Sequence, residues 1–274
     1  THVIPPEGVI SSGTPVSGYT KITYDGRGNV AEVRKVAKAN TGLADIVISA
    51  GYDASCTYMA KCNLPNWSKD ARGYQTDYIY DNATGNLLTV TLPAVGGVAP
   101  KTTNTYLSFA ANYKNSAGTL VASGLPVSRL VATSQCLSLA SCTGSANETR
   151  KEIAYNNNNR LPSSTISKAG DGSVISSISY TYDSIGNVVT VDGPQSGTAD
   201  TTRYRYNAAR QVVGVVGPDP DGSGSRLPLA VRNIYDSDGQ LSATETGNVA
   251  SQSDADWNSF SPLQRIENQY DGNR

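Results

Sequence analysis

Residues 180–188 read YTYDSIGNV, and this stretch contains the pattern that decides the fold. Tyr180 and Tyr182 are two positions apart, which places both rings on one face of a β-strand. Asp183 follows where its side chain can hydrogen-bond the backbone two residues on, and Gly186 supplies the left-handed conformation that a tight hairpin usually needs. The valine that ends the stretch starts the next strand. The stretch therefore predicts one β-hairpin.

The same pattern recurs along the chain as Tyr, Asp or Asn, three variable positions, a polar residue and then Leu or Val. Nine of the 16 tyrosines head a copy, and three more lie two positions upstream of one. The copies from Tyr80 (YDNATGNL) and Tyr113 (YKNSAGTL) carry one extra residue in the turn, a damaged copy starts at Tyr52, and a cut-off copy, YDGNR, starts at Tyr270. The motif residues of the clearest copies are Tyr24, Asp25 and Gly28; Tyr80, Asp81 and Gly85; Tyr155 and Asn156; Tyr182, Asp183 and Gly186; Tyr206 and Asn207; and Tyr235, Asp236 and Gly239.

The repeats predict an all-β chain. The composition agrees, because 16 Tyr and 26 Gly stand beside only 2 Phe and 1 Met, and Tyr, Val and Thr favour strands while Gly and Asn favour turns. A single hairpin is only marginally stable in water. The copies should therefore stack as repeated β-hairpins in one continuous antiparallel sheet that buries a face of Tyr, Val and Leu.

The copies of the form YDxxGN[VL], the YxYD lead-ins and the stretch DARGYQTDYIYD (residues 70–81) resemble the YD-repeat or RHS-repeat family. This family includes bacterial RHS proteins, wall-associated proteins, the shell-forming components of insecticidal toxin complexes, and teneurins. The resemblance implies a spiralling antiparallel sheet that forms part of a shell around a cargo, or of an elongated β-assembly. It covers residues 20–274, which are expected to form the repeat array, with residues 1–19 as an N-terminal extension. The chain is expected to be a fragment or a subunit of a larger entity.

One four-residue match to a family motif concerns self-cleavage of the chain. Shell-forming members of the family have a core resembling an aspartyl self-protease near a D-P-x-G stretch, and Asp219-Pro220-Asp221-Gly222 fits those letters. The long core rich in Gly, Asn and Tyr is missing upstream and repeats resume downstream, which favours a hairpin loop. A cation site using Asp219, Asp221 and Ser223 is the other alternative, although a complete calcium loop needs further ligands.

The four cysteines indicate the compartment. Cys56 and Cys62 are six residues apart, and so are Cys136 and Cys142. An even count at one repeated spacing predicts two local disulfides in an oxidising compartment, so a secreted, extracellular or cell-surface protein is expected. Zinc sites and redox-active pairs usually have shorter spacings. The segments at residues 54–68 and 133–148 are interpreted as disulfide-stapled loop insertions.

The sequence offers no set of catalytic residues. The only histidine, His2, lies at the N-terminus, so no Ser-His-Asp or Cys-His arrangement can be assembled. No phosphate-binding glycine pattern occurs, and no cofactor or metal site is expected. A net charge of −1 gives no support for a nucleic-acid partner, and no apolar run approaches the roughly 18 residues that span a bilayer. One short helix capped by Ser253 is expected in residues 253–268, interrupted by Pro262 and followed by a strand.

Two non-enzymatic functions therefore stay open. The first is a structural scaffold, a YD/RHS-repeat segment of a secreted or cell-surface bacterial protein that belongs to a toxin-associated encapsulating shell. The second is a subunit of an extracellular filament or of an adhesive, carbohydrate-binding appendage. The expected partners are the rest of the parent RHS polypeptide or neighbouring copies, joined through sheet edges, and a carbohydrate or protein receptor.

Overall fold

The fold was determined as a computed structural model that describes residues 2–3, 18–38, 40–156, 161–197, 199–222 and 224–271. These residues form eighteen strands and one short helix, so the all-β expectation is confirmed. Their bounds are β1 (His2–Val3), β2 (Thr20–Tyr24), β3 (Val30–Lys35), β4 (Ile46–Gly51), β5 (Trp67–Lys69), β6 (Gln75–Tyr80), β7 (Leu87–Thr91), β8 (Lys101–Lys114), β9 (Leu120–Cys136), β10 (Glu148–Tyr155), β11 (Pro162–Ala169), β12 (Ile175–Tyr182), β13 (Val188–Asp192), β14 (Thr202–Tyr206), β15 (Val212–Val216), β16 (Leu229–Tyr235), β17 (Leu241–Asn248), α1 (Asp254–Asn258) and β18 (Ser261–Glu267).

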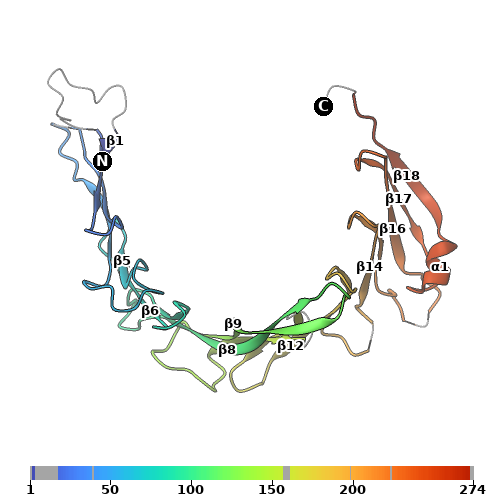
Figure 1. The fold of residues 1–274 in the computed structure, drawn as a ribbon, viewed down its shortest axis with the longest axis horizontal. Coiled ribbons are helices and arrows are strands. Elements are labelled where there is room, and N and C mark those ends of the chain that lie inside the picture. The colour runs from blue at the N-terminus through green and yellow to red at the C-terminus, as the bar shows by residue number, and fades with distance from the viewer. Residues whose placement is uncertain are drawn as a thin grey trace. The chain divides into compact units, whose positions relative to one another are not determined.

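The strands belong to one antiparallel sheet in which each strand pairs with the next one along the chain (Figure 1). This is the repeated-hairpin topology that the sequence predicts. Because neighbouring strands alternate in direction, every second connection returns to the same edge of the sheet. The YD turns therefore follow one edge, and the other connections follow the opposite edge.

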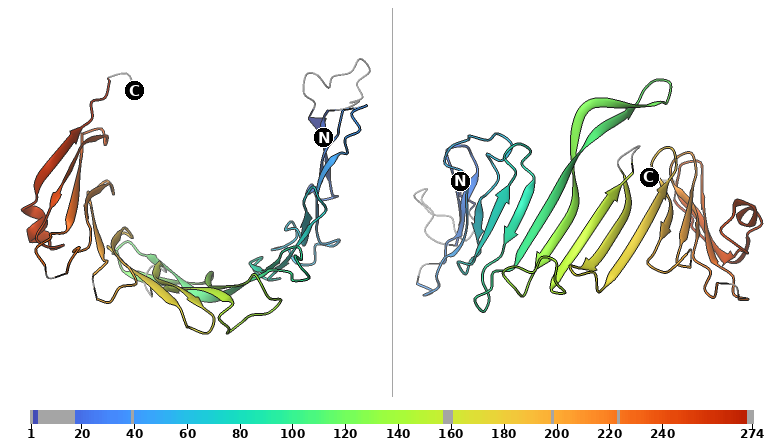
Figure 2. Two further views of the ribbon diagram at one scale, coloured as in Figure 1. Left: turned by 180° about the vertical axis from the view of Figure 1, so that it is seen from behind. Right: turned by 90° about the horizontal axis from the view of Figure 1, so that it is seen from below.

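The chain divides into two compact units. The N-terminal unit comprises Thr1–Phe109, Pro126–Lys151 and Ala169–Ser173, and the C-terminal unit comprises Ala110–Leu125, Glu152–Lys168 and Val174–Arg274. The division passes through β8 and β9, the two longest strands, with 14 and 17 residues, which form the green hairpin in Figure 2. Residues 1–19, expected as an extension, include β1, which pairs with β2 through His2 and Lys21.

In the N-terminal unit, one face of the sheet has a row of apolar side chains. Ile22 lies opposite Val33, which lies opposite Ile48 on the next strand. Farther along, Tyr78 lies opposite Val90. Directly opposed residues share a face, so the Tyr/Val face expected from the repeats is present.

In the C-terminal unit, a small core forms on the face of the sheet opposite to the one that carries Tyr204 and Val215. Val216, Ala230, Val249 and Phe260 are buried together, and Trp257 packs against them. Trp257 belongs to α1, which is capped by the Ser253 side chain and lies beside β17 and β18 (Figure 1). The predicted order of a Ser-capped short helix followed by a strand is confirmed.

Candidate functional site

The YD turns share one hydrogen-bonded structure, which the first copy shows. The Asp25 N–H donates to the Asn29 carbonyl (2.9 Å), and the Gly28 N–H donates back to the Asp25 carbonyl (3.1 Å). The Asp25 carboxylate accepts from the N–H groups of Arg27 (2.8 Å) and Asn29 (2.9 Å). Gly28 has φ +87°, and the strand pairing shifts by one residue at Tyr24. These are the features of a turn closed by a left-handed residue and a β-bulge.

Four of the later copies repeat this arrangement. In each of these four, the Asp or Asn side chain accepts a hydrogen bond from at least one backbone N–H of its own turn. Their cap and left-handed residue are Asp81 and Gly85, Asp183 and Gly186, Asn207 and Arg210, and Asp236 and Gly239. In the copy at Tyr155, the Asn156 N–H donates to the Leu161 carbonyl, while residues 157–160 lie outside the described residues. The end of the YDGNR copy, residues 272–274, also lies outside them.

The copy around Tyr113 is aligned differently from the sequence prediction. The Asn115 N–H donates to the Thr119 carbonyl, and the Asn115 side chain accepts from the N–H groups of Ala117 and Thr119. Asn115 therefore takes the Asp position, and Lys114 takes the Tyr position. The prediction of an extra residue in this turn was wrong. The side chain that caps the turn sets the register of the turn, and a Tyr one position away from the Tyr position of the motif does not.

Sequence reasoning also missed a turn of this type at the opposite edge. In DARGY, between β5 and β6, Asp70 accepts from the N–H groups of Arg72 (2.9 Å) and Tyr74 (3.0 Å), and Gly73 has φ +84°. The spacing Asp-x-x-Gly was the available signal. It was hidden because no tyrosine precedes the aspartate.

Tyrosine hydroxyl groups connect successive hairpins. The Tyr206 hydroxyl donates to the Val188 carbonyl (2.9 Å), and the Tyr235 hydroxyl donates to the Val212 carbonyl (3.1 Å). Each acceptor is the residue that begins the second strand of the preceding copy. The same contact joins three further pairs, Tyr52 to Val30, Tyr182 to Pro162 and Tyr270 to Leu241. The motif tyrosine is therefore both a packing residue and a hydrogen-bond donor between repeats.

The first disulfide loop occupies the place of a YD turn. Cys56 and Cys62 are disulfide-bonded, with Cα atoms 5.1 Å apart, in the connection between β4 and β5. Asp53, the aspartate of the damaged copy, holds this loop by accepting from Asn66 Nδ2 (2.7 Å) and pairing with Lys61 Nζ (3.2 Å). These hydrogen bonds, first that of Asn66 and then that of Lys61, lower the pKa of Asp53.

The second disulfide loop surrounds a buried carboxylate. Cys136 and Cys142 are bonded, with Cα atoms 5.5 Å apart, in the connection between β9 and β10. Glu148 is buried beside them, where its carboxylate accepts from Ser134 Oγ and from the Gly144 N–H. These two hydrogen bonds lower the pKa of Glu148. The carboxylate therefore fixes the loop while it is ionised, and every contact described for it is structural.

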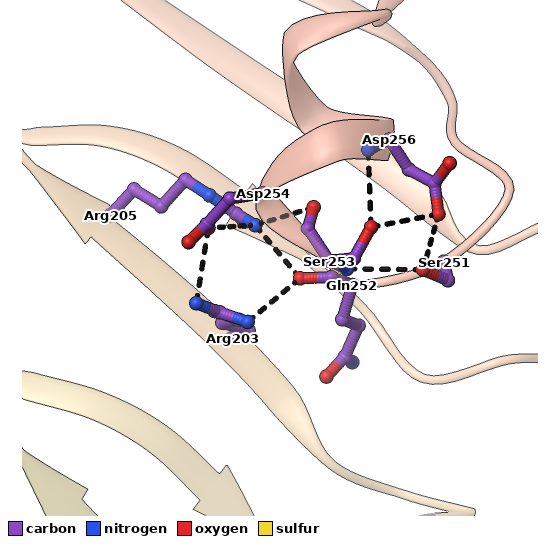
Figure 3. Close-up of polar contacts among 7 residues, drawn as sticks. All are labelled: Arg203, Arg205, Ser251, Gln252, Ser253, Asp254 and Asp256. Atoms are coloured by element: carbon purple, nitrogen blue, oxygen red, sulfur yellow. Dashed lines mark hydrogen bonds and ion pairs between the residues drawn. The ribbon is translucent and has the colours of Figure 1, made fainter.

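A cluster of arginines holds the α1 segment on β14. Arg203 and Arg205 both donate to the Gln252 carbonyl (3.1 and 2.8 Å) and to Asp254 Oδ1 (3.0 Å each), as Figure 3 shows. The Arg205 guanidinium also lies 4.9 Å from the Trp257 ring centroid. Desolvation lowers the pKa of Arg205. Ion pairs with Asp254 and the stacking of Arg205 on Trp257 therefore join β14 to α1.

The described residues include no group of three His, Cys, Asp or Glu side chains that could hold a metal ion. In the loop that contains Asp219, the Asp221 N–H donates to Asp219 Oδ1 (3.2 Å) and the Arg226 N–H donates to Asp221 Oδ2 (3.1 Å). Ser223, the third oxygen donor of the cation alternative, lies outside the described residues. Within the described part of the chain no helix has the length and apolar character needed to cross a bilayer.

Comparison with known proteins gives structural neighbours. No protein-family model matches the chain, and no curated protein matches it. The crystal structure of TcdB2-TccC3-Cdc42 matches with a TM-score of 0.55 and 14% identity, over 88% of this chain and 12% of that one. The structure of TcdB2-TccC3 without its hypervariable C-terminal region matches with the same TM-score and identity over 87% and 12%. The chain thus spans about an eighth of the length of these neighbours, and at this identity the likeness is one of fold.

Proposed function

We propose that this chain is a non-enzymatic structural scaffold, a YD/RHS-repeat segment of a secreted or cell-surface protein that contributes to a toxin-associated encapsulating shell. The observation that carries the proposal is the series of tyrosine hydroxyl bonds between successive hairpins. Through these bonds, the side chains of the repeated motif hold one hairpin to the next. The motif residues thus serve the continuity of the sheet.

The structural neighbours support this proposal. TcdB2 and TccC3 are components of Tc toxins, and the sheet of this chain is similar to part of their fold. Two disulfides support a location outside the reducing cytosol. The rest of the parent polypeptide would then be the main partner, joined through the sheet.

The test is the size and form of the native parent protein. An antibody raised against residues 1–274 should recognise a secreted polypeptide far heavier than the 28.8 kDa of this chain. Negative-stain microscopy of that polypeptide should show single hollow particles. A native protein of 28.8 kDa would contradict the proposal that this chain is part of a shell.

A second candidate is the assembling subunit, and one observation favours it. Among the described residues, β18 pairs with β17 and with no other strand, and its seven residues are all exposed. Such an edge can pair with a strand of another molecule. Regular filaments composed of 28.8 kDa subunits would support this function over the shell.

A further inference from the structure

The two disulfides have the same spacing in the sequence but differ in accessibility. In the first, Cys56 is exposed, whereas Cys62 is only 4% exposed. In the second, Cys136 and Cys142 are 7% and 4% exposed, so both ends are buried. A thiolate reduces a disulfide by attacking one of its sulfur atoms, and the rate therefore depends on access to that atom. The first disulfide has one accessible end, and both ends of the second are shielded.

The accessible end lies on the outer arc of the first disulfide loop. Every residue from 54 to 60 is exposed. The Cys56 sulfur lies 3.6 Å from the sulfur of Met59, which is 84% exposed. A thiolate approaches a disulfide along the S–S axis, from the side opposite the sulfur that leaves. Because Cys62 is buried and Cys56 is exposed, an approach to the Cys56 sulfur begins in solvent.

The second disulfide is shielded by the contacts of its own loop. The Cys142 sulfur lies 3.6 Å from the Gln135 carbonyl oxygen. The buried Glu148 carboxylate accepts from Ser134 Oγ and from the Gly144 N–H (2.7 Å), and these hydrogen bonds lower the pKa of Glu148. An ionised carboxylate in this loop also opposes the approach of an anionic thiolate. Burial and charge thus protect the same bond.

The first disulfide loop contacts the YD turns on both sides of it. On one side, Arg27 Nη2 donates to the Asp53 carbonyl (2.5 Å). On the other side, the Ala60 carbonyl lies so close to Gly85 that a Cβ at position 85 would clash with it. Arg27 and Gly85 belong to the turns of the first and third copies. The loop therefore joins two copies that are not neighbours in the repeat.

We propose that the Cys56–Cys62 disulfide is a thiol-reactive site, where a low-molecular-weight thiol of the glutathione class opens the first disulfide loop while the second disulfide stays oxidised. The thiolate attacks Cys56 Sγ and forms a mixed disulfide there, and Cys62 leaves as a thiolate that takes a proton from water. A second thiolate then attacks the sulfur of the bound thiol and releases Cys56. Two thiols are oxidised to one disulfide, and the protein disulfide is reduced to two thiols. Exposed disulfides are commonly the labile ones.

Reduction should loosen the first disulfide loop and leave the sheet folded. Asp53 still holds the loop through Lys61 Nζ (3.2 Å) and Asn66 Nδ2 (2.7 Å) after the bond opens. In the chain-entropy model, a disulfide stabilises less as the loop it closes becomes shorter, and this one joins cysteines only six positions apart. The strands on either side therefore stay paired. The scaffold proposal stands or falls separately, because it makes no use of this reaction.

The first test compares the two disulfides in the native chain. The protein is incubated with reduced glutathione, samples are alkylated with iodoacetamide at intervals, and the peptides are identified by mass spectrometry. Cys56 and Cys62 should be alkylated at least about tenfold faster than Cys136 and Cys142, and glutathione should appear on Cys56 in samples quenched early with acid. Equal rates for the two pairs would overturn the proposal, and glutathione on Cys62 would overturn the choice of the attacked sulfur.

The same reaction in urea is the control for burial. Once the chain is unfolded, all four cysteines should react at equal rates, because access no longer differs. A difference that persists in urea would place its cause in the local sequence and would overturn the argument from the fold.

Hydrogen exchange then follows the loop itself. After glutathione treatment, amide exchange should become faster at residues 53–66 and stay unchanged in the distant turn at residues 236–240. Unchanged exchange at residues 53–66 would overturn the effect on the loop. Faster exchange throughout the sheet would overturn the expectation that the response is local.

Two matched double variants assign the effect to one bond. Cys56→Ser with Cys62→Ser should show the faster loop exchange without any thiol, and glutathione should not increase it further. Cys136→Ser with Cys142→Ser should keep the slow loop exchange until glutathione is added. The same behaviour in both variants would overturn the assignment to the first disulfide.

Discussion

Tyrosine hydroxyl groups in this chain bond to carbonyl groups of the preceding hairpin, a contact that phenylalanine could not make. The sequence contains 16 Tyr and 2 Phe, and for five of these tyrosines the contact is a physical reason for a hydroxyl group at that position. The repeat pattern predicted the packing role of the ring from period two alone. It could not predict the acceptor, because the acceptor belongs to a different copy and is a backbone atom.

The hydroxyl contact leads to a prediction for Tyr206. Tyr206→Phe keeps the ring and removes the donor to the Val188 carbonyl, so the free energy of unfolding should fall by about 1 kcal/mol. The measurement is urea unfolding followed by circular dichroism. Tyr58→Phe, at an exposed ring of the first disulfide loop, is the control and should change stability little. An equal loss in both variants would contradict a special role for the inter-hairpin bond.

The left-handed turn position gives a second prediction. Gly28 has φ +87° and no atom within 4 Å of a Cβ added there, so Gly28→Ala introduces backbone strain without a clash. It should reduce the free energy of unfolding by about 1–2 kcal/mol. Gly26→Ala in the same turn is the matched control, because Gly26 also has open space and lacks a positive φ. If the two variants unfold at the same urea concentration, the strain argument fails.

At the scale of elements, the docking of α1 depends on a glycine in β15. A Cβ on Gly214 would lie 2.6 Å from the Trp257 ring, which is too close for any real contact. Gly214→Ala should therefore displace the segment at residues 249–260 and cost about 1–3 kcal/mol. Tryptophan fluorescence in a Trp67→Phe background should shift to the red. Gly217→Ala, whose added Cβ would only reach 3.6 Å from the Leu229 carbonyl oxygen, should leave the spectrum unchanged.

The pairing of β16, β17 and β18 should depend on pH through Glu245. Glu245 is buried between Arg232 and Arg265, with oxygen-to-nitrogen distances of 2.6 Å to each, and the hydrogen bond of Arg232, followed by that of Arg265, lowers its pKa. A carboxylate whose pKa is lower in the folded state stabilises the fold above its unfolded pKa, and this contribution is lost as the pH falls through the folded pKa.

The test compares urea unfolding of the wild type and of Glu245→Gln between neutral pH and the acid range. The wild type should lose stability as the pH falls below about 4.5, the usual pKa of this group, and Glu245→Gln should lose less over the same interval. Parallel curves for the two proteins would show that Glu245 does not carry the effect.

Sequence reasoning was strongest for elements whose signals are local. The Ser253 cap and the proline after it located the helix and the strand that follows. It was weaker where a long-range contact decides the structure. The docking of Trp257 over Gly214 joins residues 43 positions apart, and a cleft between residues 70–74 and 92–100 depends on two connections that are neighbours only in the folded sheet. No spacing rule in the sequence brings such segments together.

At the scale of the whole molecule, each hairpin contacts its neighbours in the chain, so stability should be close to a sum of hairpin and interface contributions. The local repeat was therefore enough to predict the sheet as a class. The division into two units was not predicted, because it falls inside β8 and β9, where the repeat pattern continues across the boundary. Interruptions of the pattern, such as the disulfide loops, do not coincide with that division.

The edge strand β18 leads to the last prediction. Leu263 is 80% exposed and Ile266 is 57% exposed, on a strand whose only described partner is β17. An edge with apolar side chains and unpaired backbone groups associates with other strands, and lysine on such an edge opposes this association. Residues 1–274 should therefore grow in size with concentration in light scattering, and the double variant Leu263→Lys, Ile266→Lys should stay monomeric. Lysine substitutions at Val95 and Val174, which lie outside β18, should not restore a monomer.

Ordered filaments of the wild type would favour the assembling subunit, and disordered aggregates would favour a shell segment separated from its neighbours. A wild-type monomer at all concentrations would refute the need for a partner at this edge.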